Sequence, residues 1–248
     1  MNLFEHIGRF ILMIGSAFKK PEKWKVLWKN FIHEINSIGI SSLSIVALLS
    51  LFMGAVMVIQ TASNIDSVLI PDYTVGFATR QSMILEFSST MICLILAGKV
   101  GSNIASEIGT MRLTEQIDAL EVMGVNSINH LVLPKILASL FIFPFIVLIS
   151  MGLGLIGGGL IGTQAGIITL EKYIMGLQYY FEPFSITYSL FKTLFFAFFI
   201  ATIPSYFGYY VNPSGGALEV GKSGTKSVVA SSMVILLINL IITYFMLL

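Results

Sequence analysis

The sequence has few charged residues, few histidines and a single cysteine. Only 11% of its 248 residues are Asp, Glu, Lys or Arg, whereas soluble domains carry roughly 25%. Cys93 has no partner within the chain, which excludes a secreted disulfide scaffold. The net charge of +1 and the absence of a recurring basic face exclude a nucleic-acid binder of the usual kind.

Apolar residues are abundant instead, at 56% of the chain with a mean hydropathy of +0.88. A soluble chain of 27.2 kDa could not bury this much apolar surface in one core, so the sequence predicts a membrane protein. A spanning helix needs about 20 mostly apolar residues. Five stretches meet this requirement, near residues 40–60, 82–100, 131–161, 186–207 and 228–248. The third is long enough to tilt or to contain a kink at Pro144.

Residues 1–36 precede these spans and are predicted to form one or two amphipathic helices in the membrane surface, ahead of a five-span domain at 37–248. Their apolar residues recur at helical spacing (Phe4, Ile7, Phe10, Ile11 and Ile14). Trp24 and Trp28 are expected to anchor the segment at the interface. A cytosolic extension is the alternative.

The distribution of Lys and Arg predicts that the N-terminus is cytoplasmic and the C-terminus periplasmic. The N-terminal segment holds Arg9, Lys19, Lys20, Lys23, Lys25 and Lys29. The connections after the second and fourth spans, with their edges, add Lys99, Arg112, Lys135, Lys222 and Lys226. The opposite side holds Arg80 and Lys172, and the side of Lys192 is ambiguous.

Two motif matches do not indicate chemistry. Residues 216–223 fit the phosphate-binding pattern G-x-x-x-x-G-K-[ST], but no strand precedes them and the connection is too short for a nucleotide-binding domain. Gly152, Gly154 and Gly157 fit a dinucleotide fingerprint, but they lie within a span, where small residues favour close helix packing. The histidines have no metal-ligand spacing, so no catalytic or metal site is predicted.

The connection between the second and third spans contains a short amphipathic helix, predicted at 114–123. Leu113, Ile117 and Leu120 share one face, and Glu115, Asp118 and Glu121 occupy the others. Thr114 is the predicted N-cap and Gly124 the predicted stop. Such a helix either closes the loop or docks into a groove on a cytoplasmic partner.

Several segments resemble the signature of the MlaE/YrbE permease family. They are residues 97–101 (AGKVG), 107–111 (EIGTM) and 114–124 (TEQIDALEVMG). Phe52-Met53-Gly54 followed by Gln60, Lys192 in the fourth span and residues 215–229 extend the resemblance over most of the chain. The sequence departs from the family pattern at three places: no Arg or Gly-Pro pair flanks Glu86, Lys99 replaces an arginine, and Asn239 stands where the family has an aspartate.

The resemblance implies an all-α membrane protein with an N-terminal interfacial helix, five transmembrane helices and a cytoplasmic coupling helix at about 104–124. Family members are non-enzymatic inner-membrane permease subunits of ABC-type lipid transporters. They pair with a second copy, bind a cytoplasmic ABC ATPase that holds ATP and Mg, and work with a periplasmic MCE-domain protein. Some complexes add a STAS-domain protein. No cofactor is expected in this chain, and the transported molecule is phospholipid or another apolar lipid.

The resemblance also assigns candidate residues to two sites. ATPase coupling is expected from Glu107, Thr110, Met111, Arg112, Thr114, Glu115, Gln116, Asp118, Leu120, Glu121 and Met123. Lipid binding is expected from Met53, Met57, Gln60, Glu86 and Lys99. A carboxylate at membrane depth either lines a cavity or has a structural partner, so Glu86 either contacts lipid or pairs with Lys192, which could instead extend toward the interface.

Two functions from other classes compete with this interpretation. A stand-alone secondary transporter would need coupling carboxylates in several spans, and the spans offer only Glu86. A non-transporting membrane scaffold would recruit partners without needing Glu86. Neither accounts for the acidic amphipathic helix together with the family signature.

Overall fold

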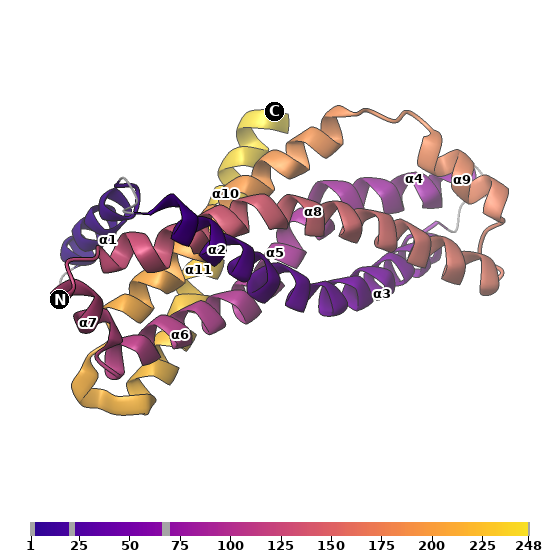
Figure 1. The fold of residues 1–248 in the computed structure, drawn as a ribbon. Coiled ribbons are helices and arrows are strands. Elements are labelled where there is room, and N and C mark those ends of the chain that lie inside the picture. The colour runs from indigo at the N-terminus through magenta and orange to yellow at the C-terminus, as the bar shows by residue number, and fades with distance from the viewer. Residues whose placement is uncertain (1–2, 20–22, 66–69, 248) are drawn as a thin grey trace. The chain divides into compact units, whose positions relative to one another are not determined.

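The protein is helical throughout the part of the chain that its computed structural model describes, residues 3–19, 23–65 and 70–247 (Figure 1). Five helical runs are long and apolar enough to cross a membrane: Trp24–Ser63, Tyr73–Leu113, Ser127–Gln164, Phe184–Tyr209 and Pro213–Met246. The five predicted spans and the all-α class are therefore confirmed.

The runs are built from elements whose bounds differ from the predicted ends. The elements are α1 Leu3–Ala17, α2 Trp24–Glu34, η1 Ile35–Ile40, α3 Ser41–Ser63, α4 Tyr73–Ser82, η2 Met83–Met91, α5 Ile92–Leu96, η3 Ala97–Gly101, α6 Ser102–Leu113, α7 Gln116–Val122, α8 Ser127–Gln164, α9 Leu170–Gln178, α10 Phe184–Tyr209, η4 Pro213–Gly215 and α11 Gly216–Leu247. The first, second and fifth runs begin 9 to 16 residues before their predicted starts, because a helix continues into polar turns that hydropathy does not detect. The π-helical stretches η1, η2 and η3 join α-helices without a break.

The chain divides into two compact units, which we describe separately. Unit 1 contains residues 1–41, 94–143 and 194–248, and unit 2 contains residues 42–93 and 144–193. The long helices α8 and α10 each contribute to both units. The boundary predicted after residue 36 falls within η1, inside unit 1, and stays a prediction.

In unit 1, α11 packs along α6 and η3. Its apolar core includes Ala17, Val132, Ile136 and Ala201, which are fully buried. A Cβ on Gly208 would lie 2.7 Å from the carbonyl oxygen of Ala105, so α10 approaches α6 at backbone distance. Residues 216–223 form the first turns of α11, which agrees with rejecting them as a phosphate-binding loop.

The N-terminal segment forms two helices, α1 and α2, as the sequence allowed. One face of α1 packs on unit 1, where His6 Nδ1 lies 2.7 Å from Tyr206 Oη and Asn129 Nδ2 donates to the Ala17 carbonyl at 2.6 Å. The opposite face exposes Phe4 and Leu12. The predicted basic residue Lys20 lies outside the described residues. A helix that packs one face on the protein and exposes apolar side chains on the opposite face suits a membrane surface.

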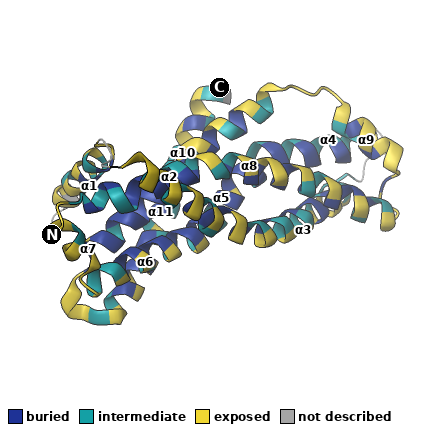
Figure 2. Ribbon diagram, viewed as in Figure 1, coloured by how far each residue is buried: buried dark blue, intermediate teal, exposed yellow. Residues whose placement is uncertain are grey.

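In unit 2, α3 and α8 pack through glycines. A Cβ on Gly54 would collide with the Gly154 backbone, and one on Gly157 would collide with the Leu51 carbonyl. Gly154 and Gly157 therefore act in helix packing, as predicted. Gly152 was wrongly included in this role, because a Cβ there would meet nothing within 4 Å. Figure 2 shows α3 buried along one side and exposed along the other.

The other end of unit 2 is closed by α4 and α9. Arg80 is buried and donates hydrogen bonds to the carbonyls of Leu177 at 2.7 Å and Tyr179 at 3.0 Å, at the C-terminal end of α9. These bonds satisfy carbonyls that a helix end leaves without partners. Cys93 is fully buried in unit 2.

Candidate functional site

The coupling helix predicted at about 104–124 is two helices: α6, which is the last part of the second helical run, and α7, which lies between the second and third runs. Helix α6 ends at Leu113 and α7 begins at Gln116. Glu115 stands between them in the left-handed region, with φ of 58°, a conformation that breaks a helix. Thr114 was wrongly predicted as the N-cap of α7, because its hydroxyl instead donates to the Thr110 carbonyl at 2.9 Å and belongs to the end of α6.

The predicted end and apolar face of α7 are confirmed. Gly124 has φ of 79°, and the amide of Val125 donates to the Leu120 carbonyl at 3.0 Å, which is the bond of a glycine-terminated helix. Ile117 is fully buried, and Leu113 and Leu120 are half-buried. This face holds α7 against unit 1.

The end of α7 exposes two large apolar side chains. Val122 is 89% exposed and Met123 is 68% exposed. Met123 was among the predicted coupling residues and Val122 was not. The position of Val122 beside Met123 on a short amphipathic helix could have identified it from the sequence. Single apolar residues are often exposed, but two adjacent ones at a helix end make a small contact surface.

The acidic residues of α7 have different interaction partners. Asp118 pairs with Arg112 at 2.6 Å. Glu121 Oε1 accepts hydrogen bonds from Tyr209 Oη at 2.8 Å and Ser127 Oγ at 2.9 Å. These two hydrogen bonds hold the pKa of the Glu121 carboxyl below its ordinary value of 4.5. Glu121 therefore links α7 to the end of α10 and the start of α8.

A buried lysine joins three elements of unit 1. Lys135 Nζ on α8 lies 2.6 Å from Glu34 Oε1 on α2 and 2.7 Å from Glu107 Oε2 on α6. The predicted coupling residue Glu107 is thus paired with Lys135, while its own side chain stays 41% exposed. Sequence reasoning missed the roles of Lys135 and Glu34, although charges placed beside apolar runs were a signal.

The remaining predicted coupling residues lie on α6, α7 and the joint between them. They are Thr110, Met111 and Arg112 on α6, Glu115 at the joint and Gln116 on α7. Thr110, Glu115 and Gln116 are exposed, and Met111 and Arg112 are half-buried. The structure therefore brings the predicted coupling residues together on one short stretch of unit 1.

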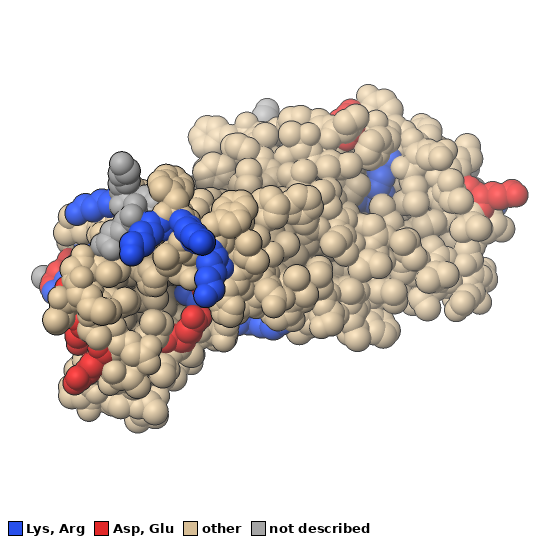
Figure 3. Space-filling view, in the orientation of Figure 1, with Lys and Arg blue, Asp and Glu red and all other residues tan. Residues whose placement is uncertain are grey.

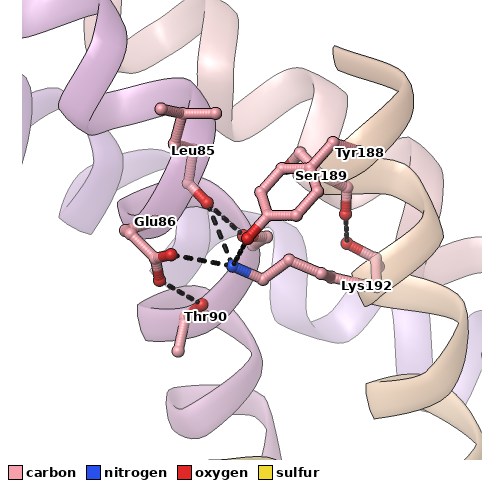
Figure 4. A network of polar contacts seen from close by, with 8 residues as sticks. Leu85, Glu86, Thr90, Tyr188, Ser189 and Lys192 are labelled. Carbon is pink, nitrogen blue, oxygen red and sulfur yellow. Dashed lines mark hydrogen bonds and ion pairs between the residues drawn. The ribbon is translucent and has the colours of Figure 1, made fainter. Parts of the chain in front are cut away.

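The second candidate site is a charged pair inside unit 2 (Figure 4). Lys192 Nζ on α10 lies 2.9 Å from Glu86 Oε1 on η2, and it donates to the Leu85 carbonyl and to Tyr188 Oη, each at 3.2 Å. The ammonium has three protons, so these acceptors satisfy it completely. Its nitrogen also lies 4.7 Å from the centre of the Tyr188 ring, a cation–π distance.

The two charges of this pair differ in exposure. The side chain of Lys192 is 0% exposed, so its predicted extension toward the interface is wrong. The side chain of Glu86 is 43% exposed, and Thr90 Oγ1 donates to its Oε2 at 2.9 Å. Glu86 lies in the π-helical stretch η2, and π-helical turns in helices are frequent at functional sites. The pair presents a carboxylate to its surroundings and hides the ammonium.

The other predicted lipid contacts are spread over both units. Met53 and Met57 are half-buried on α3, and Gln60 is exposed near the end of that helix. With Glu86, these residues belong to unit 2. Lys99 belongs to unit 1, where its ammonium donates to the Ser41 carbonyl.

Comparison with known proteins gives the family. The family model of Permease MlaE matches residues 31–245, which include all five membrane spans except the first turns of the first and the last residue of the fifth. The chain belongs to the MlaE permease family. It is therefore an ABC transporter permease, a multi-pass membrane subunit that is not itself catalytic.

Curated relatives cover nearly the whole chain. A probable ABC transporter permease protein of Rickettsia bellii is 34% identical over 98% of this chain and 93% of its own length. The intermembrane phospholipid transport system permease protein MlaE of Haemophilus influenzae is 26% identical over 99% and 94%. The chloroplastic protein TRIGALACTOSYLDIACYLGLYCEROL 1 of Arabidopsis thaliana is 27% identical over 94% of this chain and 66% of its own length.

Proposed function

We propose that this chain is the inner-membrane permease subunit of an ATP-driven phospholipid transporter. Two copies would form the membrane part, with a cytoplasmic ABC ATPase on one side and a periplasmic MCE-domain protein on the other. A STAS-domain protein, which some complexes of the family contain, would be a further partner. The N-terminus would be cytoplasmic and the C-terminus periplasmic. The phospholipid transport named for the Haemophilus relative supports the choice of cargo.

The observation that carries this proposal is the construction of α7. Its buried face holds it to unit 1, and its end presents Val122 and Met123 outward. A short helix with exposed apolar residues fits a groove on a partner. The partner would be the ATPase, which would hold ATP and Mg.

Movement of the ATPase would reach the spans through Glu121. Its carboxylate bonds to Ser127 at the start of α8 and to Tyr209 at the end of α10. A displacement of α7 would therefore pull on two membrane helices at once. Helix α7 is delimited at both ends by a residue in the left-handed region, Glu115 before it and Gly124 after it.

The lipid path would use Met53, Met57, Gln60, Glu86 and Lys99. Flexible thioethers on α3 would accommodate acyl chains of different shape. Glu86 would meet the headgroup with a half-exposed carboxylate whose partner Lys192 is hidden. That arrangement favours a headgroup that donates hydrogen bonds, such as an amine or a hydroxyl, over a bare phosphate.

The proposal is tested by purifying the tagged protein gently from native membranes and identifying the proteins and lipids that accompany it. Val122→Asp should abolish recovery of the ATPase, because a charge would be buried in the groove. The membrane part should remain folded, since the side chain of Val122 is 89% exposed. Leu170→Asp on α9, also at an exposed apolar position, is the matched control and should retain the ATPase.

Either of two results would contradict the proposal. One is an unaltered protein that never retains an ATPase in any detergent, which would favour a stand-alone transporter built around Glu86. The other is full ATPase binding and lipid-stimulated hydrolysis in Val122→Asp, which would remove the docking role from α7.

A further inference from the structure

A basic and aromatic face surrounds the start of α2. It consists of Lys19, Lys23, Lys25, Lys29, Trp24 and Trp28, all of them exposed. The two indole side chains are 68% and 64% exposed. Figure 3 shows Lys and Arg side chains gathered over the part of the surface that carries α1 and α2. We call these six residues the α2 face.

The positive charge of the α2 face is not neutralised within the described residues. None of its four lysines forms an ion pair there, whereas Arg9, Arg112, Lys135 and Lys172 each pair with a carboxylate. Four lysines close together in the sequence, without an ion pair in the part of the chain that the structure describes, produce a positive potential that attracts an anion. An external anionic surface is therefore the natural complement of this face.

The geometry of α2 places its lysines and tryptophans side by side. Successive residues of a helix turn by about 100°. Lys25 and Lys29 therefore form one row, and Trp24 and Trp28 form a parallel row about 100° away. On the far side of the tryptophans, Leu27 and Phe31 are half-buried. Around the helix, the lysine row is therefore followed by the tryptophan row, and the tryptophan row by the half-buried apolar side chains.

The position of α2 along the chain identifies what this face meets. Helix α2 continues through η1 into α3, the first membrane span, without a break. Phe31 contacts Phe141 on α8, with ring centres 6.0 Å apart, which fixes α2 against unit 1. Tryptophans that flank a span lie at headgroup level. The lysines next to them therefore lie among lipid phosphates.

We infer that the α2 face is a binding surface for anionic phospholipid headgroups, formed by the lysines around the Trp24–Trp28 row. The lysines contact headgroup phosphates, and the indoles insert at the boundary with the acyl chains. Clusters of four or more basic residues next to a span bind anionic lipids in this way. The surface belongs to unit 1 and Glu86 to unit 2, and the inference does not depend on lipid being transported.

The composition of the chain provides a direct probe, because Trp24 and Trp28 are its only tryptophans. The full chain is placed in phosphatidylcholine vesicles that contain the same minor fraction of either brominated phosphatidylglycerol or brominated phosphatidylcholine. Bromine quenches indole fluorescence only at close range. We expect quenching by the anionic lipid to exceed quenching by the neutral lipid by a factor of about 2 or more at low salt.

The matched variants differ only in which lysine pair is removed. Lys25→Gln/Lys29→Gln should bring the quenching ratio toward 1. Lys222→Gln/Lys226→Gln removes the same charge from two exposed lysines with the same spacing on α11, a helix that contains no tryptophan, and should leave the ratio unchanged. In the unaltered protein, added salt should lower the ratio, which tests the inference even if a variant does not fold.

Three results would overturn the inference. A quenching ratio near 1 in the unaltered protein at low salt would show that the face does not select anionic lipid. An acidic protein would then be the alternative ligand of the face. A ratio that survives both removal of Lys25 and Lys29 and added salt would exclude a role for their charge. An equal loss in both variants would indicate a general effect of net charge.

Discussion

At the scale of single residues, glycines decide how closely the helices of unit 2 pack. Gly157 on α8 faces the Leu51 carbonyl so closely that any side chain would displace the backbone of α3, whereas Gly152, five residues earlier, faces open space. The sequence pattern included both glycines and could not distinguish them, because spacing along a helix does not reveal what stands opposite.

Gly157→Ala should therefore destabilise the protein, and Gly152→Ala should not. Forcing a methyl group into a packed contact costs about 1–3 kcal/mol, while alanine in an open helical position gains helix propensity. The two variants can be compared by thermal unfolding in detergent. Equal Tm values for the pair would contradict the close packing of α3 and α8.

Glu121 is a second residue whose environment has a measurable consequence. Its pKa is lower in the folded protein than in the unfolded chain. Its carboxylate therefore stabilises the fold above the unfolded value of about 4.5, and this contribution is lost as the pH falls through the lower, folded value. The Tm of the unaltered protein should exceed that of Glu121→Gln at neutral pH, and the difference should shrink in acid. A Tm difference between the two proteins that grew in acid would contradict a lowered pKa of Glu121 in the folded state.

At the scale of elements, Lys135 holds together α2, α6 and α8. Both of its carboxylate partners come from helices that are distant in sequence, so no local pattern predicted the cluster. The cluster joins the helix that enters the first span to the helix that leads to α7. It therefore joins the helix that carries the α2 face to the helix that precedes the proposed ATPase-docking segment.

Lys135→Met should cost about 3–5 kcal/mol, because it leaves the buried carboxylate of Glu34 without a counterion. Adding Glu34→Gln to this variant should restore part of the loss. Lys172→Met removes an exposed lysine from its pair with Asp72 and should cost at most about 1 kcal/mol. Denaturant titration in mixed micelles measures all three. A Lys135 variant as stable as the Lys172 variant would contradict the structural role of the cluster.

At the scale of the whole molecule, hydropathy and family signature predicted the five spans, the helices of the N-terminal segment and the membrane class. They did not predict where helices begin and end, because polar turns continue a helix wherever backbone hydrogen bonds can still form. The break at Glu115 was also missed, since a left-handed non-glycine residue leaves no compositional trace. The pairing of Glu86 with Lys192 was one of two alternatives; the fold shows the pair, and the 43% exposure of Glu86 keeps lipid contact as a proposal.

The burial of Cys93 has a practical consequence for establishing how the protein lies in its membrane. The only thiol of the chain is sealed inside unit 2, so the native protein already serves as a background that is silent to maleimide reagents. A cysteine introduced at Met123 and another at Leu170, both exposed, would each be the sole reactive thiol. Labelling intact cells and opened membranes with an impermeant maleimide would then assign each position to one side of the bilayer, with no native residue removed.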